Sequence, residues 1–83
     1  MSIHKSFEGS ELTDAPDAGG ALVKSVEQGS PAAQAGLRAD DVIVGANRGR
    51  VSSLRELHER AKGTAVLVLE VRRGNTVILI PLR

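Results

Sequence analysis

His4 and His58 are the only imidazoles in the sequence, and therefore the first candidates for a general base. Serine nucleophiles are plentiful, but serine catalysis also needs a base and a third group that orients it. The sequence contains no G-x-S-x-G motif to present such a nucleophile. A chain of 83 residues also has little room for a deep, enclosed active site. We therefore expect no catalytic residues and no enzymatic activity in this chain.

Metal and cofactor chemistry finds no support in the residue pattern either. The sequence has no cysteine, which excludes disulfides and thiolate metal ligands. Its two histidines have no acidic residues at ligand spacing, and neither a P-loop nor a dinucleotide fingerprint occurs. Asp40 and Asp41 are adjacent, so their carboxylates are expected to point apart as solvated turn residues before a strand. We expect no metal site and no cofactor.

The charged residues argue against a nucleic-acid partner. Eleven Lys and Arg nearly balance ten Asp and Glu, for a net charge of +1, and Phe7 is the single aromatic residue. A nucleic-acid binder usually concentrates excess positive charge and stacking rings. Arg48, Arg50, Arg72 and Arg73 could cluster across two turns. We interpret them as a solvated face, with contact to another protein as the alternative. A small basic barrel that binds RNA remains the runner-up function.

Turn residues and hydrophobic periodicity predict the helices and strands that position these residues. Ser30 is a helix N-cap, Pro31 suits the first helical position, and Gly36 suits a left-handed C-terminal cap. Ser53 and Glu56 form an S-x-x-E capping box for a second helix, Leu54 to Ala61, which Gly63 ends. The predicted strands are 6–12, 21–26, 42–45, a short return strand that begins at Val51, 65–72 and 76–82, with loops or turns at 13–20, 47–50 and 74–75. Pro81 should lie at a strand end or on a sheet edge.

The run GSPAAQAGLRADDVIVGANRGRV, residues 29–51, resembles the signature of PDZ domains from bacterial Deg/HtrA serine proteases. The family pattern is G-S-P-A-x-x-A-G-L-x-x-x-D-V-I-x-x-x-N. Its fixed positions are met by Gly29, Ser30, Pro31, Ala32, Ala35, Gly36, Leu37, Asp41, Val42, Ile43 and Asn47. The R-R-G-N run of Arg72 to Asn75 is similar to the closing hairpin of the family. The similarity extends over nearly the whole chain.

This resemblance implies an α+β PDZ fold with the HtrA-type strand order. The fold is a small antiparallel β-sandwich or partly open barrel, capped by two helices. Residues 6–83 would be the single domain, and residues 1–5 an N-terminal extension or added residues. The closing VILIPLR and the GSEL of Gly9 to Leu12 look most like the second, C-terminal PDZ copy of DegP/DegQ-like enzymes.

The resemblance also implies a peptide-binding groove between the strand at Phe7 to Glu11 and the helix Leu54 to Ala61. PDZ domains bind peptides by strand addition, with side-chain pockets for specificity. A peptide carboxylate would lie on the backbone N–H groups of Lys5, Ser6 and Phe7. The expected binding residues are Lys5, Ser6, Phe7, Glu8, Gly9, Ser10, Leu54, His58 and Ala61. Core packing is the favoured interpretation for both Leu54 and Leu57, with groove lining as the alternative. For His58 and Ala61, groove lining and another role remain equally open.

The carboxylate loop departs from the family pattern, which affects the expected function. Lys5 replaces a hydrophobic residue, and Ser6 replaces the glycine that lets several N–H groups converge. We therefore expect assembly contacts with a neighbouring subunit's PDZ domain to matter more than capture of unfolded polypeptides or peptide C-termini. The implied parent is a periplasmic, homo-oligomeric serine endopeptidase, the isolated domain is expected to be monomeric, and no membrane partner is expected. A PDZ domain of a non-protease scaffold or secretion system is a further alternative.

Overall fold

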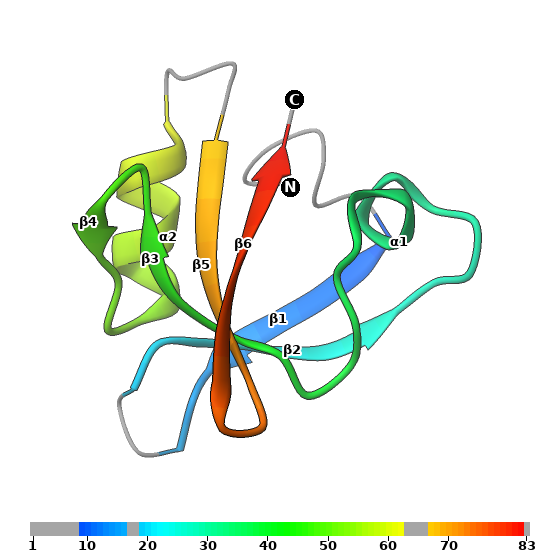
Figure 1. Ribbon diagram of the computed structural model, residues 1–83, viewed down its shortest axis with the longest axis horizontal. Coiled ribbons are helices and arrows are strands. Elements are labelled where there is room, and N and C mark those ends of the chain that lie inside the picture. The colour runs from blue at the N-terminus through cyan, green and yellow to red at the C-terminus, as the bar shows by residue number, and fades with distance from the viewer. Residues whose placement is uncertain (1–8, 17–18, 63–66, 83) are drawn as a thin grey trace.

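The computed structural model describes residues 9–16, 19–62 and 67–82. In these ranges six antiparallel strands form one sheet with two short helices beside it (Figure 1). The strand order is β1-β2-β3-β5-β6, and β4 pairs with β3 beside this path. The sheet is open, with β1 and β6 at its two ends, and agrees with the expected α+β class. The elements are β1 (Ser10–Asp14), β2 (Ala21–Val26), α1 (Pro31–Ala35), β3 (Val42–Ala46), β4 (Gly49–Arg50), α2 (Leu54–Ala61), β5 (Leu67–Arg73) and β6 (Thr76–Leu82).

Helix α1 has the caps that the sequence predicts. The Ser30 hydroxyl oxygen accepts a hydrogen bond from the N–H of Ala33 at 3.2 Å, and Pro31 occupies the first turn. Gly36 has a φ of 106° and donates its N–H to Ala33 at 3.1 Å, while Leu37 donates to Ala32 at 3.2 Å. These two bonds make a Schellman cap, and the buried side chain of Leu37 returns the chain to the core.

The predicted position of the first strand is partly wrong. We expected a strand over 6–12 and a loop over 13–20, but β1 continues through Thr13 to Asp14. Thr13 pairs with Leu22 and Asp14 with Ala21, and the Ala15 N–H closes the turn on the Gly20 carbonyl at 2.9 Å. Pro16, Gly19 and Gly20 therefore belong to the connection between β1 and β2. Thr13 and Asp14, which precede them, are still paired with β2. Residues 6–8 lie outside the described ranges.

The β3–β4 connection also differs from the sequence prediction. Asn47 and Arg48 have φ values of 50° and 69°, so they form a two-residue turn of the kind that joins twisted antiparallel strands. The turn pairs Ala46 with Gly49, and the return strand is therefore Gly49–Arg50. Val51, where we expected that strand to begin, follows it with its side chain buried.

Helix α2 begins at the predicted cap, but the capping box is only half formed. The Ser53 side chain accepts a hydrogen bond from the Glu56 N–H at 3.2 Å. The Glu56 carboxylate, however, accepts from the N–H of Ser52 at 2.9 Å and from the Ser52 hydroxyl. These bonds from Ser52 hold the pKa of Glu56 below its ordinary value. The described helix ends at Ala61, and Gly63 lies outside the described residues.

Strand β5 has one buried face and one exposed face. Leu67, Leu69 and Val71 are buried, and the alternate residues point to the other side of the sheet. The Gly74–Asn75 turn leads into β6, as the sequence predicts, with Arg73 opposite Thr76. The predictions for 65–72 and 76–82 agree with β5 and β6 in the described residues. Pro81 lies opposite Val68 on the edge strand, which confirms its predicted position.

Asp41 contradicts the prediction of a solvated turn residue. Its side chain is 2% exposed and accepts hydrogen bonds from Arg73 Nε at 2.8 Å, Arg73 Nη2 at 2.6 Å and the Arg38 N–H at 2.9 Å. Arg73 Nη2 also donates to the Gly36 carbonyl at 2.9 Å. The bonds to Asp41 raise the pKa of Arg73. Arg73 therefore does not belong to the solvated arginine face that the sequence predicted. Asp40 is exposed, as expected.

Replacement of Leu57 by alanine should destabilise the domain by about 2–5 kcal/mol, because its fully buried side chain would leave a cavity. Urea denaturation measures this loss. Arg55→Ala, on the exposed side of the same helix, is the control and should change the free energy of unfolding by less than about 0.5 kcal/mol. A loss near zero for Leu57→Ala would contradict the core position of Leu57.

Asp41→Asn should cost about 2–3 kcal/mol, because Arg73 would keep its charge and lose its partner. The side chain of Arg73 is 32% exposed, so water compensates part of the loss. Asp40→Asn is the matched control, since it removes the same charge from the neighbouring exposed position, where asparagine tolerates the φ of 75°. Guanidinium denaturation at neutral pH compares the two variants, and equal stabilities would refute the structural role of Asp41.

Candidate functional site

Strand β1 presents an open edge of the sheet. Among the described residues it pairs with β2 alone. The Gly9 carbonyl accepts from Glu27 at 2.6 Å and the Ala15 N–H donates to Gly20, so positions 9 and 15 face β2. The register between β1 and β2 shifts between Glu11 and Leu12, in the middle of this edge. An extended chain could add there as a further strand.

The start of α2 is fixed to the end of this edge strand. The Leu54 N–H donates to the Asp14 carboxylate at 2.7 Å, across 40 residues of sequence. The side chains of Leu12 and Leu54 are both partly buried and pack against the core. The other end of the helix contacts β4, because Arg60 Nε donates a hydrogen bond to the Arg50 carbonyl at 2.9 Å. The edge and the helix are therefore held in a fixed relation, and both can contact an added strand.

The sequence-predicted binding residues do not all lie in one place. Gly9 and Ser10 lie at the start of β1, and Leu54 lies beside its end. His58 is exposed on α2. Ala61 is 2% exposed and belongs to the hydrophobic core, so the structure gives its side chain a packing role. Lys5, Ser6, Phe7 and Glu8 lie outside the described residues.

Gly9 has a packing role that the sequence analysis did not assign. Its φ is 88°, and a Cβ at this position would lie 2.2 Å from the Ser30 Cβ. The start of β1 therefore packs directly on the N-cap of α1, and only glycine fits there. Asp14 was missed for a different reason, because it lay in the predicted loop while its partner is in a distant helix.

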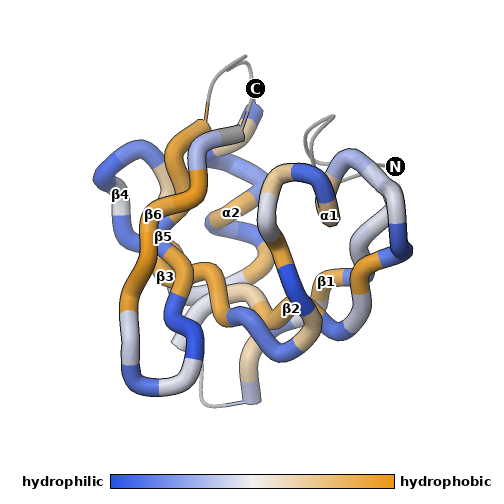
Figure 2. The backbone as a smooth tube through the Cα atoms, turned by 45° about the vertical axis from the view of Figure 1, so that its right-hand side comes forward, coloured by the Kyte–Doolittle hydropathy of each residue, from blue (hydrophilic) through white to orange (hydrophobic). Residues whose placement is uncertain are grey.

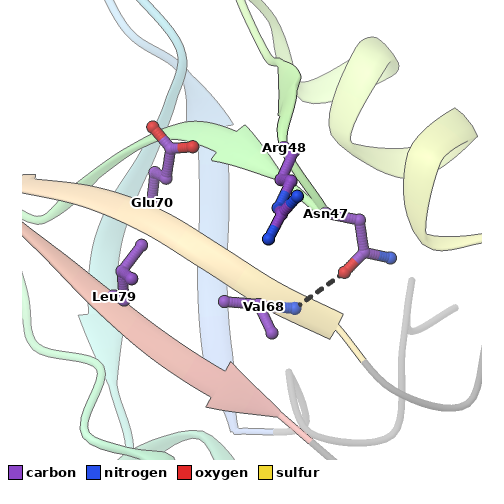
Figure 3. Close-up of a pocket in the computed structure, with 5 residues that line it drawn as sticks. All are labelled: Asn47, Arg48, Val68, Glu70 and Leu79. Carbon is purple, nitrogen blue, oxygen red and sulfur yellow. Dashed lines mark hydrogen bonds between the residues drawn. The ribbon is translucent and has the colours of Figure 1, made fainter.

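A hollow lies on the exposed face of β5 and β6. It has a volume of about 490 Å³ and is lined by Asn47, Arg48, Val68, Glu70 and Leu79 (Figure 3). Asn47 joins the β3–β4 turn to β5, because its N–H donates to the Val68 carbonyl at 2.8 Å and its Oδ1 accepts from the Val68 N–H at 2.9 Å. Leu79 is 66% exposed. Figure 2 shows the hydrophobic stretch of β6 that carries it.

The charged side chains of the described residues do not form a metal site. No group of three His, Cys, Asp or Glu in these ranges could hold an ion. Within the same ranges, no helix has the length and apolar character needed to span a membrane.

Comparisons with known proteins agree with this geometry. The family profile described as "PDZ domain" matches residues 5–81. The periplasmic pH-dependent serine endoprotease DegQ of Escherichia coli K12 is 44% identical over 85 residues, which cover 98% of this chain and 19% of DegQ. The periplasmic serine endoprotease DegP of the same organism is 38% identical over 80 residues, covering 95% of this chain and 17% of DegP. The chain thus spans about a fifth of the length of these curated relatives.

A solved structure extends the likeness to the fold. The PDZ domain of HtrA3, bound to the phage-derived ligand FGRWV, superimposes with a TM-score of 0.76 at 30% identity. The match covers 89% of this chain and 79% of that one. Sequence and structure agree on one assignment: the chain belongs to the PDZ domain family, a class of protein-interaction modules, and matches the PDZ domains of Deg/HtrA serine proteases.

Proposed function

We propose that this domain binds extended polypeptide segments weakly at β1 and mainly serves the assembly and regulation of a periplasmic, protein-quality-control serine protease. The open edge of β1 beside the start of α2 is the observation that carries the binding role. Residues 6–83 would form the domain, with 1–5 as an extension or added residues. The catalytic residues of the homo-oligomeric parent would lie in another part of its chain.

Strand addition at β1 sets the scale of affinity. Four or five backbone hydrogen bonds contribute roughly 0.5–1.5 kcal/mol each. One buried Leu or Val side chain of the ligand, packed near Leu12 and Leu54, adds about 1.5–3 kcal/mol. Ordering of the extended ligand opposes these gains. The expected affinity is therefore micromolar at best, where the binding free energy is about −8 kcal/mol.

The residues before β1 reduce this affinity further. By resemblance, the peptide carboxylate would lie on the N–H groups of Lys5, Ser6 and Phe7. The glycine that helps such groups converge is replaced by Ser6. Capture of C-termini is accordingly the weaker part of the proposed function, and unfolded segments or C-terminal peptides would dissociate quickly.

An exposed apolar surface supports the assembly role. Val77 and Leu79 on the edge strand β6 are 57% and 66% exposed. No residue from Thr76 to Leu82 carries a charge. Uncharged, apolar edge strands usually pair or pack with another chain, since they otherwise promote aggregation. A neighbouring subunit's PDZ domain is the proposed partner of this surface.

Amide chemical shifts of the labelled domain test both roles in one titration series. The peptide FGRWV should shift Leu12, Asp14 and Leu54 weakly, and the first PDZ domain of a DegQ-like protease should shift Val77 and Leu79. Leu79→Ser should abolish the second response and leave the first, because Leu79 lies at the opposite edge of the sheet from β1. Arg55→Gln is the control variant for both.

The two roles fail separately in this experiment. Strong peptide shifts at Leu12 with no response to the other PDZ domain would refute the assembly role. Absence of any peptide shift at Leu12 and Leu54 up to millimolar concentration would refute capture at β1.

A further inference from the structure

The backbone of β6 has one side that faces β5 and one that faces outward from the sheet. The turn of the closing hairpin has two residues, so Arg73 and Thr76, which flank it, exchange backbone hydrogen bonds. From this pair the register of β5 with β6 continues without a shift, and bonded and non-bonded pairs therefore alternate. The backbone groups of Val77, Leu79 and Pro81 consequently point away from β5.

Two observations support this direction of the backbone groups. The Val68 N–H and carbonyl bond to Asn47, on the side of β5 away from β6, as expected for a residue in a non-bonded pair with Pro81. Pro81 itself has no N–H, and a proline is tolerated in a strand where its nitrogen faces outward. Between the hairpin turn and Pro81, the outer edge of β6 therefore offers complete donor and acceptor pairs at Val77 and Leu79.

The two open edges of the sheet differ in how they would meet a copy of themselves. Two copies of β1 would bring like charges together, because that strand contains Glu11 and Asp14. No residue from Thr76 to Leu82 carries a charge, so β6 has no such repulsion. Among the described residues β6 pairs with β5 alone, and the side chains next to its outward groups are apolar and exposed.

We propose that β6 pairs antiparallel with β6 of a second copy of this chain, with a two-fold axis at Ile78. In this register Val77 lies opposite Leu79 of the second copy, and Leu79 lies opposite Val77 of the second copy. Each of these pairs exchanges both of its backbone hydrogen bonds. The same pairs bring four exposed apolar side chains together on one face of the joined sheet.

A second copy fits this edge better than a charged segment of another protein, because β6 has no charge for such a segment to pair with. The two outward residues are two positions apart, which is the spacing that an antiparallel two-fold pair needs. Pro81 and the turn end the edge on either side, so a longer added strand would gain no further complete pair. The contact is self-complementary and therefore closes as a dimer. Both β1 edges remain at the outer ends of the joined sheet.

The inference rests on the proposed assembly function, because it uses the same exposed surface, and it specifies an identical domain as the partner. The interface is small, and small interfaces are transient. The isolated domain would therefore be mainly monomeric at micromolar concentration and would associate near millimolar concentration. In a homo-oligomeric parent, the high effective concentration of neighbouring copies would favour the contact.

Amide spectra of the labelled domain alone, at increasing concentration, test the contact. From tens of micromolar to a few millimolar, the amides of Val77 and Leu79 should shift and exchange their hydrogens more slowly, while Leu12 stays unchanged. Val77→Lys should weaken self-association about tenfold without lowering the melting temperature, since a charge on an exposed edge position opposes pairing. Glu11→Gln changes the net charge equally on β1, and as the matched control it should leave self-association unchanged.

An equimolar mixture of Val77→Lys and Leu79→Glu tests the register. Each variant alone should stay monomeric. In the mixed pair the introduced lysine lies opposite the introduced glutamate, and association should return to within about threefold of that of the unchanged domain. Sedimentation of the mixture and of each variant alone measures this recovery.

Cysteine variants report the same register chemically, because the chain has no cysteine of its own. Opposite residues of a bonded pair have Cα atoms about 5.5 Å apart, which a disulfide spans, whereas diagonal residues lie about 7–8 Å apart. Position 77 is opposite position 79 of the second copy and diagonal to its own counterpart. Oxidation of mixed Val77→Cys and Leu79→Cys should therefore give a mixed dimer faster than either variant alone gives a dimer.

Four results would overturn the proposal. The first is no concentration-dependent shift at Val77 and Leu79 at millimolar concentration, and the second is equal self-association of the unchanged domain and Val77→Lys. The third is a concentration-dependent shift at Leu12, which indicates pairing of β6 with β1. The fourth is disulfide formation by each cysteine variant alone as fast as by the mixture. The first PDZ domain of a DegQ-like protease takes no part in these measurements, so the assembly contact with that domain and this self-pairing can fail separately.

Discussion

The ion pair between the buried Asp41 carboxylate and the partly exposed Arg73 side chain is the constraint on which the other features of this domain depend. Asp41 immediately precedes β3, and Arg73 is the last residue of β5 before the turn of the closing hairpin. The same guanidinium also holds the Gly36 carbonyl at the end of α1. A buried carboxylate is tolerated only when its charge is paired and hydrogen-bonded, so these three segments must meet in one arrangement.

This arrangement leaves two separate surfaces for binding. The alternation of side chains along β5 and β6 directs Val68, Glu70 and Leu79 away from the core, where they line one hollow. At the other end of the strand order, the bond from Leu54 to Asp14 fixes α2 beside the open edge of β1. A partner on the hairpin face and a peptide at β1 would therefore not compete for the same backbone edge.

Local signals predicted the elements whose partners are close in sequence. Ser30, Pro31 and Gly36 define α1 because caps and turn residues act within a few positions. The Gly74–Asn75 turn and the alternation in β5 predicted the hairpin for the same reason. The end of β1 was misplaced, because strand pairing with residues 21 and 22 overrode the loop composition of the segment. In the capping box, Glu56 bonds Ser52 in place of the expected Ser53 N–H, a difference of one residue that composition does not reveal.

The sequence by itself determined the family, the two helices, most strands and the absence of a catalytic motif. The motif of residues 29–51 was sufficient for the family, since its capped helix and D-V-I strand are local features in a fixed order. Only the tertiary structure decided that Asp41 is buried, that Ala61 belongs to the core, and that Arg48, Glu70 and Leu79 line one hollow. Each of these facts depends on contacts between residues far apart in the chain. Hydrophobic periodicity gives the face on which a side chain lies, but it does not give the neighbour that the side chain meets.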